Sequence, residues 1–420
     1  MANNLSSNIT RPLAKIFLEA FESSRVVTKT VNTQLLSGKF NPSTGTKVDF
    51  KRPHDYNSIR SAGGDISGAA KSDIIAGKAT GTVQPYFTSA TEWRNIQEAL
   101  ELDQLDQILE PMARRLVTDL ELDLAKFMRI NTGLNYGASG TAVDAWSDVA
   151  GAGAMMDSVG VPMSDNKYYL MNPFTTTSLA SAQSGLNAAD GLVRTAFEKA
   201  QIASNFGGMK ALTSNALSSY TSGSTTDRLG DLKTAPDATY VTAKDTMQQT
   251  MVIETLGTGT IEAGDQIQVA GVNRLNIATR QLILDTTGAA VPWTGTVLSV
   301  VTIAGNEATV VVSGAAIYEA NGQYNNVDAA PAAGAVVTIL GAAATVYQPN
   351  LFYTEQAFGL GTVKLPKLYS TDTVATTSDG MSIRVSKYSD GDANTQKIRF
   401  DLLPAYAVFQ PNFAGQGYGV

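Results

Sequence analysis

Apolar residues recur at intervals of three and four positions between Leu102 and Ile130. They are Leu105, Leu109, Met112, Leu116, Leu120, Leu124 and Phe127. This spacing places them on one side of a single long α-helix. Pro111 lacks an amide hydrogen, so it either begins the main helix or kinks a longer one. From Pro111 to Ile130 the helix is about 30 Å long, and we expect the rest of the chain to attach to it as strands and short helices.

The chain before this helix shows two weaker patterns. Residues 1–36 predict an arm in which Pro12 to Ser23 form a short amphipathic helix, followed by an extended apolar segment. Residues 37–86 carry closely spaced Gly and Pro between short strand-like pieces such as Lys47–Arg52. This composition cannot bury a core, so it predicts a ribbon of two strands with a flexible tip. Such a ribbon is marginal alone in water and needs a neighbouring surface.

After the long helix, helical and strand patterns alternate up to about residue 225. The predicted elements are helices at Trp146–Ser158, Asn172 to about Gln183 and Ala189–Ile202, and strands at Lys167–Met171 and Met209–Thr213. This alternation is typical of a compact α/β unit.

From Thr225 to about Ala344 the helical period disappears, and Val, Thr, Ala, Ile and Gly dominate. The predicted strands are Met251–Glu254, Gln266–Val269, Gly295–Ile303, Ala308–Val312 and Ala335–Leu340. A block of roughly a domain's length with this pattern predicts a β-barrel or a β-sandwich.

Helical and strand patterns occur together again after this block. We therefore interpret the β-rich block as an insertion into a domain of mixed structure. Leu351–Phe358 predicts a helix. Ser382–Lys387 and Lys397–Leu402 predict two strands around the turn Tyr388–Gln396. The last segment, Leu403–Val420, is extended and rich in Pro and Gly.

Composition narrows the class of function. Of the 420 residues, 43% are hydrophobic, and the net charge of −7 argues against an outer surface that binds nucleic acid or anionic membranes. The absence of Cys excludes disulfides and thiolate chemistry, and His54 as the only histidine nearly rules out His-based triads and His-ligated metals. The apolar run Ala329–Val346 contains Pro and Gly and lacks basic flanks, which favours buried strands over a membrane span.

Charge sorts with position along the chain. Residues 1–80 carry eleven Lys or Arg against six Asp or Glu, whereas residues 91–125 carry nine acids against three arginines. A basic ribbon and an acidic helix suggest complementary contact within or between subunits. Solvated faces that merely differ explain the pattern equally well. Asp119, Glu121 and Asp123 alternate along the helix, so they cannot converge as paired catalytic carboxylates.

One stretch begins like a calcium loop. Asp390, Asp392 and Asn394 occupy ligand positions, and Asp401 stands where the last ligand would be. Thr395 replaces the required glycine and the flanks are strand-like, so a polar hairpin tip explains the stretch better. No constellation of residues supports catalysis, and we expect neither a metal nor another cofactor.

The order of arm, ribbon, long helix, α/β unit, inserted β domain and returning hairpin resembles the major capsid proteins of tailed bacteriophages, which have the Hong Kong 97 fold. Longer stretches resemble the coat proteins of short-tailed enterobacterial phages, a branch with an inserted β domain. These stretches are Ser43–His54, Gly64–Gly68, Gly77–Gly81, Val117–Glu121, Ala200–Gly208, Gly264–Val272, Tyr388–Asn394 and Arg399–Tyr406. The resemblance covers essentially the whole chain. It implies an α+β fold with a long spine helix, an extended β-hairpin loop and an inserted all-β, barrel-like domain.

The resemblance also implies a division of the chain into five parts. They are an N-terminal arm (1–36), an extended loop (37–86), a peripheral domain (87–135 and 370–402), an axial domain (136–224, 346–369 and 403–420) and the inserted β domain (225–345). The extended loop would lie across the neighbouring subunit. The tip Tyr388–Gln396 would meet other subunits near local threefold axes.

The implied function is structural and not enzymatic. Pentamers and hexamers of the chain would assemble into an icosahedral shell around double-stranded DNA, with no sequence-specific DNA binding and no membrane. A separate scaffolding protein and a portal protein would be partners, and assembly would take place in the host cytoplasm before the protein becomes part of the virion. The expected subunit contacts are Lys47, Lys51, Arg52, Arg60, Lys71, Glu110, Asp119, Glu121, Asp123, Asp390, Asp392 and Asn394.

One feature of the founding member of this fold has no counterpart that we can place. That protein links its subunits covalently through a Lys and an Asn, so we expect a non-covalent shell here. Two other classes of protein remain as alternatives. A tail or fibre protein with a carbohydrate-binding β domain predicts internal repeats, which the sequence lacks. An α/β enzyme predicts a convergent set of titratable residues.

Overall fold

The computed structural model of the chain describes residues 17–36, 45–94, 105–184, 199, 202–368 and 372–418. The chain divides into two compact units, each built from three segments. The first unit comprises Met1–Asp49, Thr80–Ala125 and Phe358–Ala407, and the second comprises Phe50–Ala79, Lys126–Ala357 and Val408–Val420. The five-part division expected from the sequence stays a prediction.

The predicted long helix is present as α3, Leu105–Ile130, and Pro111 lies inside it. The buried side of α3 is wider than the apolar stripe in the sequence. Small residues join the leucines on that side, whereas Met112 and Phe127 are only half-buried. The buried apolar residues of the helix are Leu109, Ala113, Leu116, Val117, Leu120, Leu124, Ala125 and Met128.

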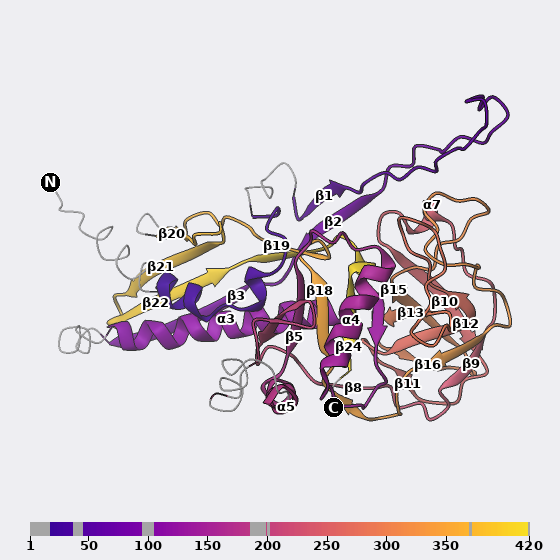
Figure 1. The fold of residues 1–420 in the computed structure, drawn as a ribbon. Coiled ribbons are helices and arrows are strands. Elements are labelled where there is room, and N and C mark those ends of the chain that lie inside the picture. The colour runs from indigo at the N-terminus through magenta and orange to yellow at the C-terminus, as the bar shows by residue number, and fades with distance from the viewer. Residues whose placement is uncertain are drawn as a thin grey trace. The chain divides into compact units, whose positions relative to one another are not determined.

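A four-stranded antiparallel sheet in the order β20–β21–β22–β3 belongs to the first unit (Figure 1). Its central pair is the predicted hairpin. The strands are β20 (Thr373–Thr376), β21 (Ser382–Asp390), β22 (Thr395–Leu402) and β3 (Phe87–Arg94). Phe400 of β22 stacks on Phe17 with ring centroids 3.9 Å apart. Phe17 begins the helical residues 17–24, the described part of the predicted N-terminal helix.

A second four-stranded sheet contains the stem of the predicted ribbon, in the order β1–β2–β23–β19. Its strands are β1 (Lys47–Lys51), β2 (Lys78–Val83), β23 (Pro404–Val408) and β19 (Phe358–Thr362). The 3-10 turn η1 (Val27–Lys29) precedes residue Asn32, which forms an isolated parallel bridge with Gly359 of β19. The ribbon stem is therefore paired with strands that are distant in sequence.

The second unit contains the predicted α/β arrangement. A six-stranded mixed sheet has the order β4–β24–β18–β5–β7–β6, with β5 and β7 parallel. Its strands are β4 (Leu134–Tyr136), β24 (Ala414–Gly417), β18 (Asn350–Thr354), β5 (Lys167–Met171), β7 (Met209–Thr213) and β6 (Asn205–Phe206), and its helices are α4 (Trp146–Val159) and α5 (Pro173–Ser184). Helix α4 contributes to the same apolar cluster as β5 and β7. The predicted helix Ala189–Ile202 lies almost wholly outside the described residues.

The helix predicted at Leu351–Phe358 is wrong. Its residues instead form β18 and the first residue of β19, with a turn between them. Every residue of β18 is buried, because the strand pairs with β24 on one side and with β5 on the other. A strand buried on both faces has no alternation of polar and apolar residues, so its sequence cannot be distinguished from that of a short buried helix.

The inserted β domain is a closed barrel in the order β10–β15–β13–β12–β16–β9. Its strands are β9 (Leu229–Leu232), β10 (Gln248–Glu254), β12 (Gln266–Asn273), β13 (Pro292–Val297), β15 (Ala308–Ser313) and β16 (Val336–Ile339). Five predicted strands are confirmed, although the one predicted at Gly295–Ile303 ends early and resumes as β14 (Val301–Thr302). Strand β9 was not predicted.

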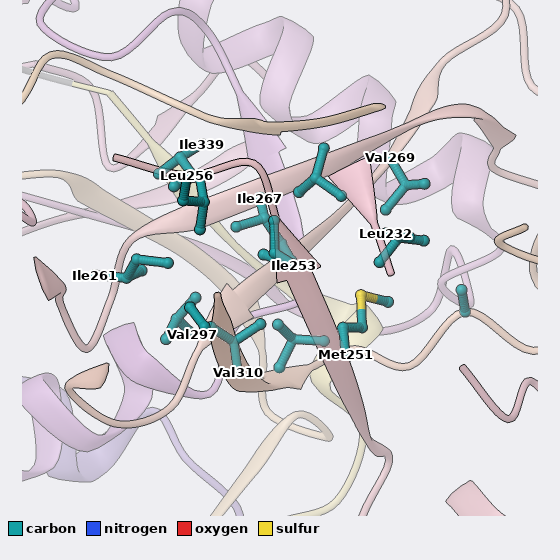
Figure 2. Close-up of a cluster of buried hydrophobic side chains, with 14 of the residues drawn as sticks. Leu232, Met251, Ile253, Leu256, Ile261, Ile267, Val269, Val297, Val310 and Ile339 are labelled. Atoms are coloured by element: carbon teal, nitrogen blue, oxygen red, sulfur yellow. The ribbon is translucent and has the colours of Figure 1, made fainter. Parts of the chain in front are cut away.

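The barrel has its own apolar core. Met251, Ile253, Ile267, Val269 and Val310 point inward from three different strands (Figure 2). Trp293 is fully buried, and its indole N–H donates a hydrogen bond to the carbonyl of Gly314 at 2.9 Å. Because successive side chains of a strand point to opposite faces, these apolar residues face the inside of the barrel and their neighbours face the outside.

Short elements complete the second unit. They are α7 (Tyr240–Ala243), η3 (Pro411–Phe413) and the two-residue strand pairs β11 (Thr260–Ile261) with β14 and β8 (Tyr220–Thr221) with β17 (Val346–Tyr347). The apolar run at residues 329–346 contributes β16 and begins β17. Among the described residues, no helix is both long enough and apolar enough to cross a membrane.

Candidate assembly surfaces and polar clusters

Four of the five predicted ribbon cations are exposed. Lys47 and Lys51 project from β1, and Arg60 and Lys71 lie further out on the loop between β1 and β2. His54 is exposed on the same loop. These positive charges face solvent in the isolated chain and are therefore accessible to another subunit.

Arg52 differs from the other ribbon cations because it is only 8% exposed. Its Nε donates to the carbonyl of Lys78 at 3.0 Å, and Nη1 donates to the carbonyl of Phe409. Burial lowers the pKa of Arg52, although Tyr240 and Asp245 counteract part of that shift. The Arg52 guanidinium therefore links the returning ribbon strand to the C-terminal segment within the second unit.

The acidic face of α3 is partly neutralised by its own arginines. Arg114 pairs with Glu110, and Arg115 pairs with Asp119 at 2.9 Å, each one helical turn apart. Such exposed pairs contribute only about 0.3–0.5 kcal/mol each. Their carboxylates therefore lose little by exchanging an intrahelical partner for a cation of another subunit.

Glu121, on the buried side of α3, is only 5% exposed. Its Oε1 accepts hydrogen bonds from the backbone N–H groups of Val26 and Thr28 and from the Thr28 hydroxyl. Burial raises the pKa of Glu121, and the hydrogen bonds from residues 26–28 offset part of that rise. The carboxylate holds the N-terminal segment against α3 within the first unit.

Asp123 is half-buried and also has an intrachain partner. The Tyr406 hydroxyl donates to its Oδ2 at 3.0 Å. Burial, together with the negative charge of Asp123, raises the pKa of Tyr406 far above its usual value. Tyr406 therefore stays neutral and keeps donating this hydrogen bond throughout the physiological pH range.

The tip between β21 and β22 is an exposed turn. Asp390 Oδ1 accepts hydrogen bonds from the N–H groups of Asp392 at 3.1 Å and Ala393 at 3.3 Å. Asn394 has a φ of 50°, which an Asn tolerates better than most residues. This geometry is that of the predicted polar hairpin tip. Among the residues that the structure describes, no group of three His, Cys, Asp or Glu side chains could hold a metal ion.

At the other end of the same hairpin, Asp401 is buried between two arginines. Its Oδ2 lies 2.6 Å from Arg384 Nη2, and its Oδ1 lies 2.6 Å from Arg399 Nε and 2.7 Å from the Thr88 hydroxyl. Burial alone would raise the pKa of Asp401, but the hydrogen bonds from Arg384, Thr88 and Arg399 hold it below its usual value. This cluster fixes three neighbouring strands in register.

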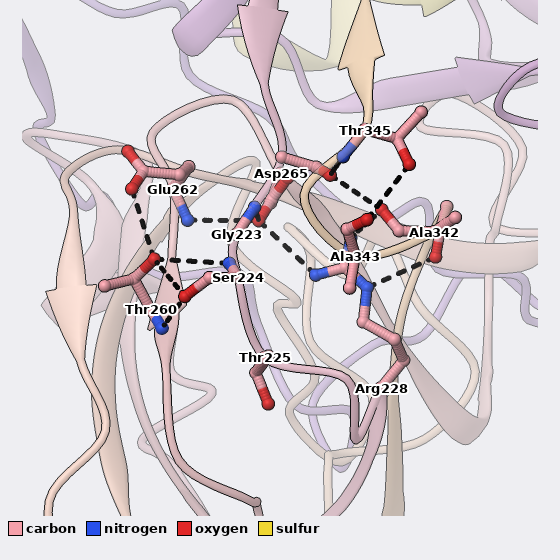
Figure 3. Close-up of polar contacts among 12 residues, drawn as sticks. Gly223, Ser224, Thr225, Arg228, Thr260, Glu262, Asp265, Ala342, Ala343 and Thr345 are labelled. Atoms are coloured by element: carbon pink, nitrogen blue, oxygen red, sulfur yellow. Dashed lines mark hydrogen bonds and ion pairs between the residues drawn. The ribbon is translucent and has the colours of Figure 1, made fainter.

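The two chain connections of the barrel meet in a polar cluster (Figure 3). The entering chain and the exiting chain pair directly, since Ser222 N–H donates to Thr345 O at 2.9 Å and Ala344 N–H donates to Gly223 O at 3.0 Å. Arg228 adds hydrogen bonds from Nε to Gly341 O at 3.2 Å and from Nη2 to the next carbonyl at 3.0 Å. We call residues 222–228, 260–265 and 341–345 the barrel root.

Asp265 lies at the centre of the barrel root and is almost fully buried. Its Oδ2 accepts hydrogen bonds from the N–H groups of Gly223 at 2.9 Å and Glu262 at 3.0 Å, and it lies 3.7 Å from Arg228 Nη1. Burial raises the pKa of Asp265, and these hydrogen bonds and the arginine offset part of the rise. The Asp265 carboxylate therefore links the chain that enters the barrel, at Gly223 and Arg228, to the turn at Glu262.

Two arginines of the inserted domain were missed by sequence reasoning. Arg274 is buried, and its guanidinium donates to the carbonyls of Gly133 and Thr294. Burial lowers the pKa of Arg274 to about 9. Arg280 forms an ion pair with Asp55 of the ribbon. One sequence feature could have drawn attention to these arginines. Both lie between Lys244 and Lys364, a stretch that contains no lysine.

Comparison with known proteins identifies the relatives of this chain. The family model described as "P22 coat protein - gene protein 5" matches residues 1–419. A curated major capsid protein from Acyrthosiphon pisum secondary endosymbiont phage 1 is 47% identical over 424 residues, covering all of both chains.

Solved structures similar to this chain come from phages. The capsid of cyanophage P-SCSP1u is 14% identical, covers 93% of this chain and 86% of its own, and has a TM-score of 0.45. A chain of Mycobacterium phage Che8 is 11% identical, covers 94% of this chain and 89% of its own, and also has a TM-score of 0.45.

The full-length relatives define the class of the protein as a phage major capsid protein, which builds a shell from copies of itself and is a component of the virion. The chain belongs to the P22 coat protein family. The expected role as the structural shell protein of a phage is thereby confirmed, and the expected α+β architecture with a long helix, an extended ribbon and an inserted barrel is the one described above. The tail or fibre alternative is not supported, because the matched relatives are coat and capsid proteins.

Proposed function

We propose that this chain forms a non-covalent icosahedral shell of pentamers and hexamers around double-stranded DNA, and that it catalyses no reaction. Assembly would take place in the host cytoplasm with a scaffolding protein, and a portal protein would occupy one site of the shell. The net charge of −7 supports the role of a DNA container, because a strongly basic lining would bind the duplex and hinder its packing.

The observation that carries this proposal is that apolar side chains of the extended loop are exposed to solvent in the isolated chain. Tyr56, Ile59, Ile66 and Ile74 are between 38% and 78% exposed in the isolated chain. A segment with so many exposed apolar residues marks a protein interaction site. The loop would bury them by lying across a neighbouring subunit.

The exposed charges would complement this apolar contact. Lys47, Lys51, Arg60 and Lys71 of one subunit would face the acids of α3 and of the β21–β22 tip in others. The proposed acidic and polar partners are Glu110, Asp119, Asp123, Asp390, Asp392 and Asn394. Arg52 and Glu121 stay in the predicted set, but their burial and intrachain hydrogen bonds support structural roles inside each subunit.

Charge reversal at exposed positions tests this pairing. Lys51→Glu with Lys71→Glu should abolish closed particles in electron micrographs while leaving a folded monomer by circular dichroism. Arg52 is unsuitable for this test because its reversal would place an unpaired charge in a buried site.

A compensating variant serves as the control. Adding Asp119→Lys and Glu110→Lys to the doubly reversed chain should restore particles if these residues pair between subunits. Normal assembly of the Lys51→Glu, Lys71→Glu chain, or no rescue by the helix substitutions, would contradict the proposed contacts.

A further inference from the structure

The base of the extended loop is attached to the inserted barrel within the same unit. On the outgoing side, Asp55 forms an ion pair with Arg280. The Asn57 side-chain amide donates to the carbonyl of Asn321 at 2.8 Å. On the returning side, the Gln323 side-chain amide donates to the carbonyl of Asp73 at 2.6 Å. The outgoing and the returning sides of the loop base are therefore both bonded to residues of the barrel loops.

An apolar cluster adds to these polar contacts. Ile75 of the loop and Tyr324 of the barrel pack on a buried cluster that includes Tyr240 and Ile317. The rings of Tyr240 and Tyr324 stack with centroids 3.6 Å apart and planes 10° apart. At Gly77 a Cβ atom would lie 2.8 Å from the carbonyl oxygen of Lys244, so only glycine allows this approach.

The barrel loops that make these contacts are themselves held in shape. Arg280 also donates to the carbonyls of Gln323 and Asn325, the latter at 2.9 Å. The side chain of Asn325 bonds to both the N–H and the carbonyl of Glu319, each at 2.8 Å. Arg280 has a φ of 57°, a conformation that a bulky residue keeps only where surrounding contacts determine it. We call Tyr240, Arg280, Asn321, Gln323 and Tyr324 the loop-docking surface.

Beyond this surface the loop has a different character. Residues 58–71 are exposed apart from the half-buried Ala69, and their described hydrogen bonds, such as Ser67 N–H to Asp65 at 2.9 Å, stay within the loop. The boundary between the held and the exposed parts falls at Asn57 and Ser72, where Asn57 N–H donates to the Ser72 hydroxyl at 2.9 Å.

We propose that the inserted barrel orients the extended loop: its loop-docking surface holds residues 53–57 and 72–77, so that the tip at 58–71 leaves the subunit in a fixed direction. This gives the inserted domain a positioning role that precedes any contact between subunits. The proposal goes beyond the proposed function, because it concerns the unassembled chain. The ion pair between Asp55 and Arg280 is the main polar contact.

Hydrogen exchange of the full-length unassembled chain, read by mass spectrometry, tests this role. Asp55→Asn and Arg280→Gln should each speed exchange of peptides covering 53–57 and 72–78 by about twofold to fivefold, as expected when local opening loses a partly exposed ion pair. Exchange of β10, β12 and β15 should not change. Lys233→Met is the matched control, because it removes the exposed Lys233–Glu307 pair on the same barrel and should leave the loop peptides unchanged.

Several results would overturn the proposal. Wild-type exchange of the loop base in Asp55→Asn, an equal effect from Lys233→Met, or loss of protection that spreads through the barrel strands would each contradict it. Should Arg280→Gln fail to fold, Asp55→Asn decides alone, because Asp55 lies on the loop and not in the barrel core. Asp55→Arg combined with Arg280→Asp should recover part of the protection, which a merely structural loss at either position would not.

Discussion

Individual buried charges in this protein are stabilised in three different ways. Asp401 has two arginines, Glu121 has backbone N–H groups, and Arg274 has backbone carbonyls. The sequence shows each of these residues only as one charge among many. Whether a charged residue is buried depends on the segments that fold over it, and for Glu121 that segment lies 95 positions away. Its place on α3 was predictable, but its partners were not.

The raised pKa of Glu121 predicts a particular dependence of stability on pH. Burial raises this pKa above the unfolded value of about 4.3. The folded state therefore binds the proton more readily, so the contribution of Glu121 to stability increases as pH falls from neutral through its raised pKa and levels off near pH 4. Glu121→Gln keeps an acceptor for the N–H groups and removes this dependence.

Urea unfolding of wild type and Glu121→Gln between pH 4 and pH 8 measures this effect. We expect the variant's stability advantage to be largest at pH 8 and to shrink as pH falls. Taking the difference between two chains removes the opposite trends of other carboxylates. A difference that is constant with pH would show that Glu121 has the same pKa in both states.

Asp401 predicts the opposite trend. Its folded pKa is below the unfolded value of about 3.9, so its contribution is complete above pH 4 and is lost as pH falls through the lowered pKa. Asp401→Asn should destabilise the chain by about 3–5 kcal/mol at pH 7, because it leaves Arg384 buried without its partner. Asp390→Asn at the exposed tip of the same hairpin is the control and should change the unfolding free energy by less than about 0.5 kcal/mol.

Among the elements, those with a clear local signal were predictable. The three- and four-residue spacing located α3, and strand-favouring composition between turn residues located β10, β12, β15 and the β21–β22 hairpin. Elements that depend on tertiary contacts were not predictable. Strand β18 is buried on both faces, and β8, β11, β14 and β17 have two residues each, too few to show a period.

The barrel root makes a prediction about the inserted domain as an element. Residues 220–347 include the β8–β17 pair and Asp265 with its hydrogen-bond donors Gly223 and Glu262 and its ion-pair partner Arg228. Expressed alone, this fragment should give dispersed amide signals by NMR. The shorter fragment 229–339 keeps the six barrel strands but lacks Arg228 and Gly223, and it should unfold at lower urea concentration. Equal stability of the two fragments would show that the root contributes nothing.

At the scale of the whole molecule, the chain combines two folded units, and the second of them carries a loop tip whose residues are exposed. The exposed isoleucines of the loop were visible in the sequence only as members of a Gly-rich stretch, and the sequence predicted correctly that this stretch cannot form a core. It could not predict that the base of the loop rests on the barrel, because the contacting residues are more than 160 positions apart. Exposed apolar surface of this kind is what assembly would bury.

The non-covalent character of the shell gives a simple prediction. Assembled particles boiled in detergent should run on a denaturing gel at the monomer mass of 44.3 kDa. Many weak contacts of the kind proposed here are reversible, and no covalent bond would survive to link the subunits. Ladders of higher mass would instead indicate a crosslink between subunits.

The most direct test is a cryo-electron microscopy reconstruction of the particle built from this chain. We expect closed icosahedral particles in which residues 58–71 lie on a neighbouring subunit, with Ile59 and Ile66 buried there, while residues 53–57 and 72–77 stay on the barrel of their own chain. A reconstruction in which residues 58–71 fold back on their own subunit and touch no other, or a chain that forms no closed particles with its scaffolding protein, would contradict the central claim.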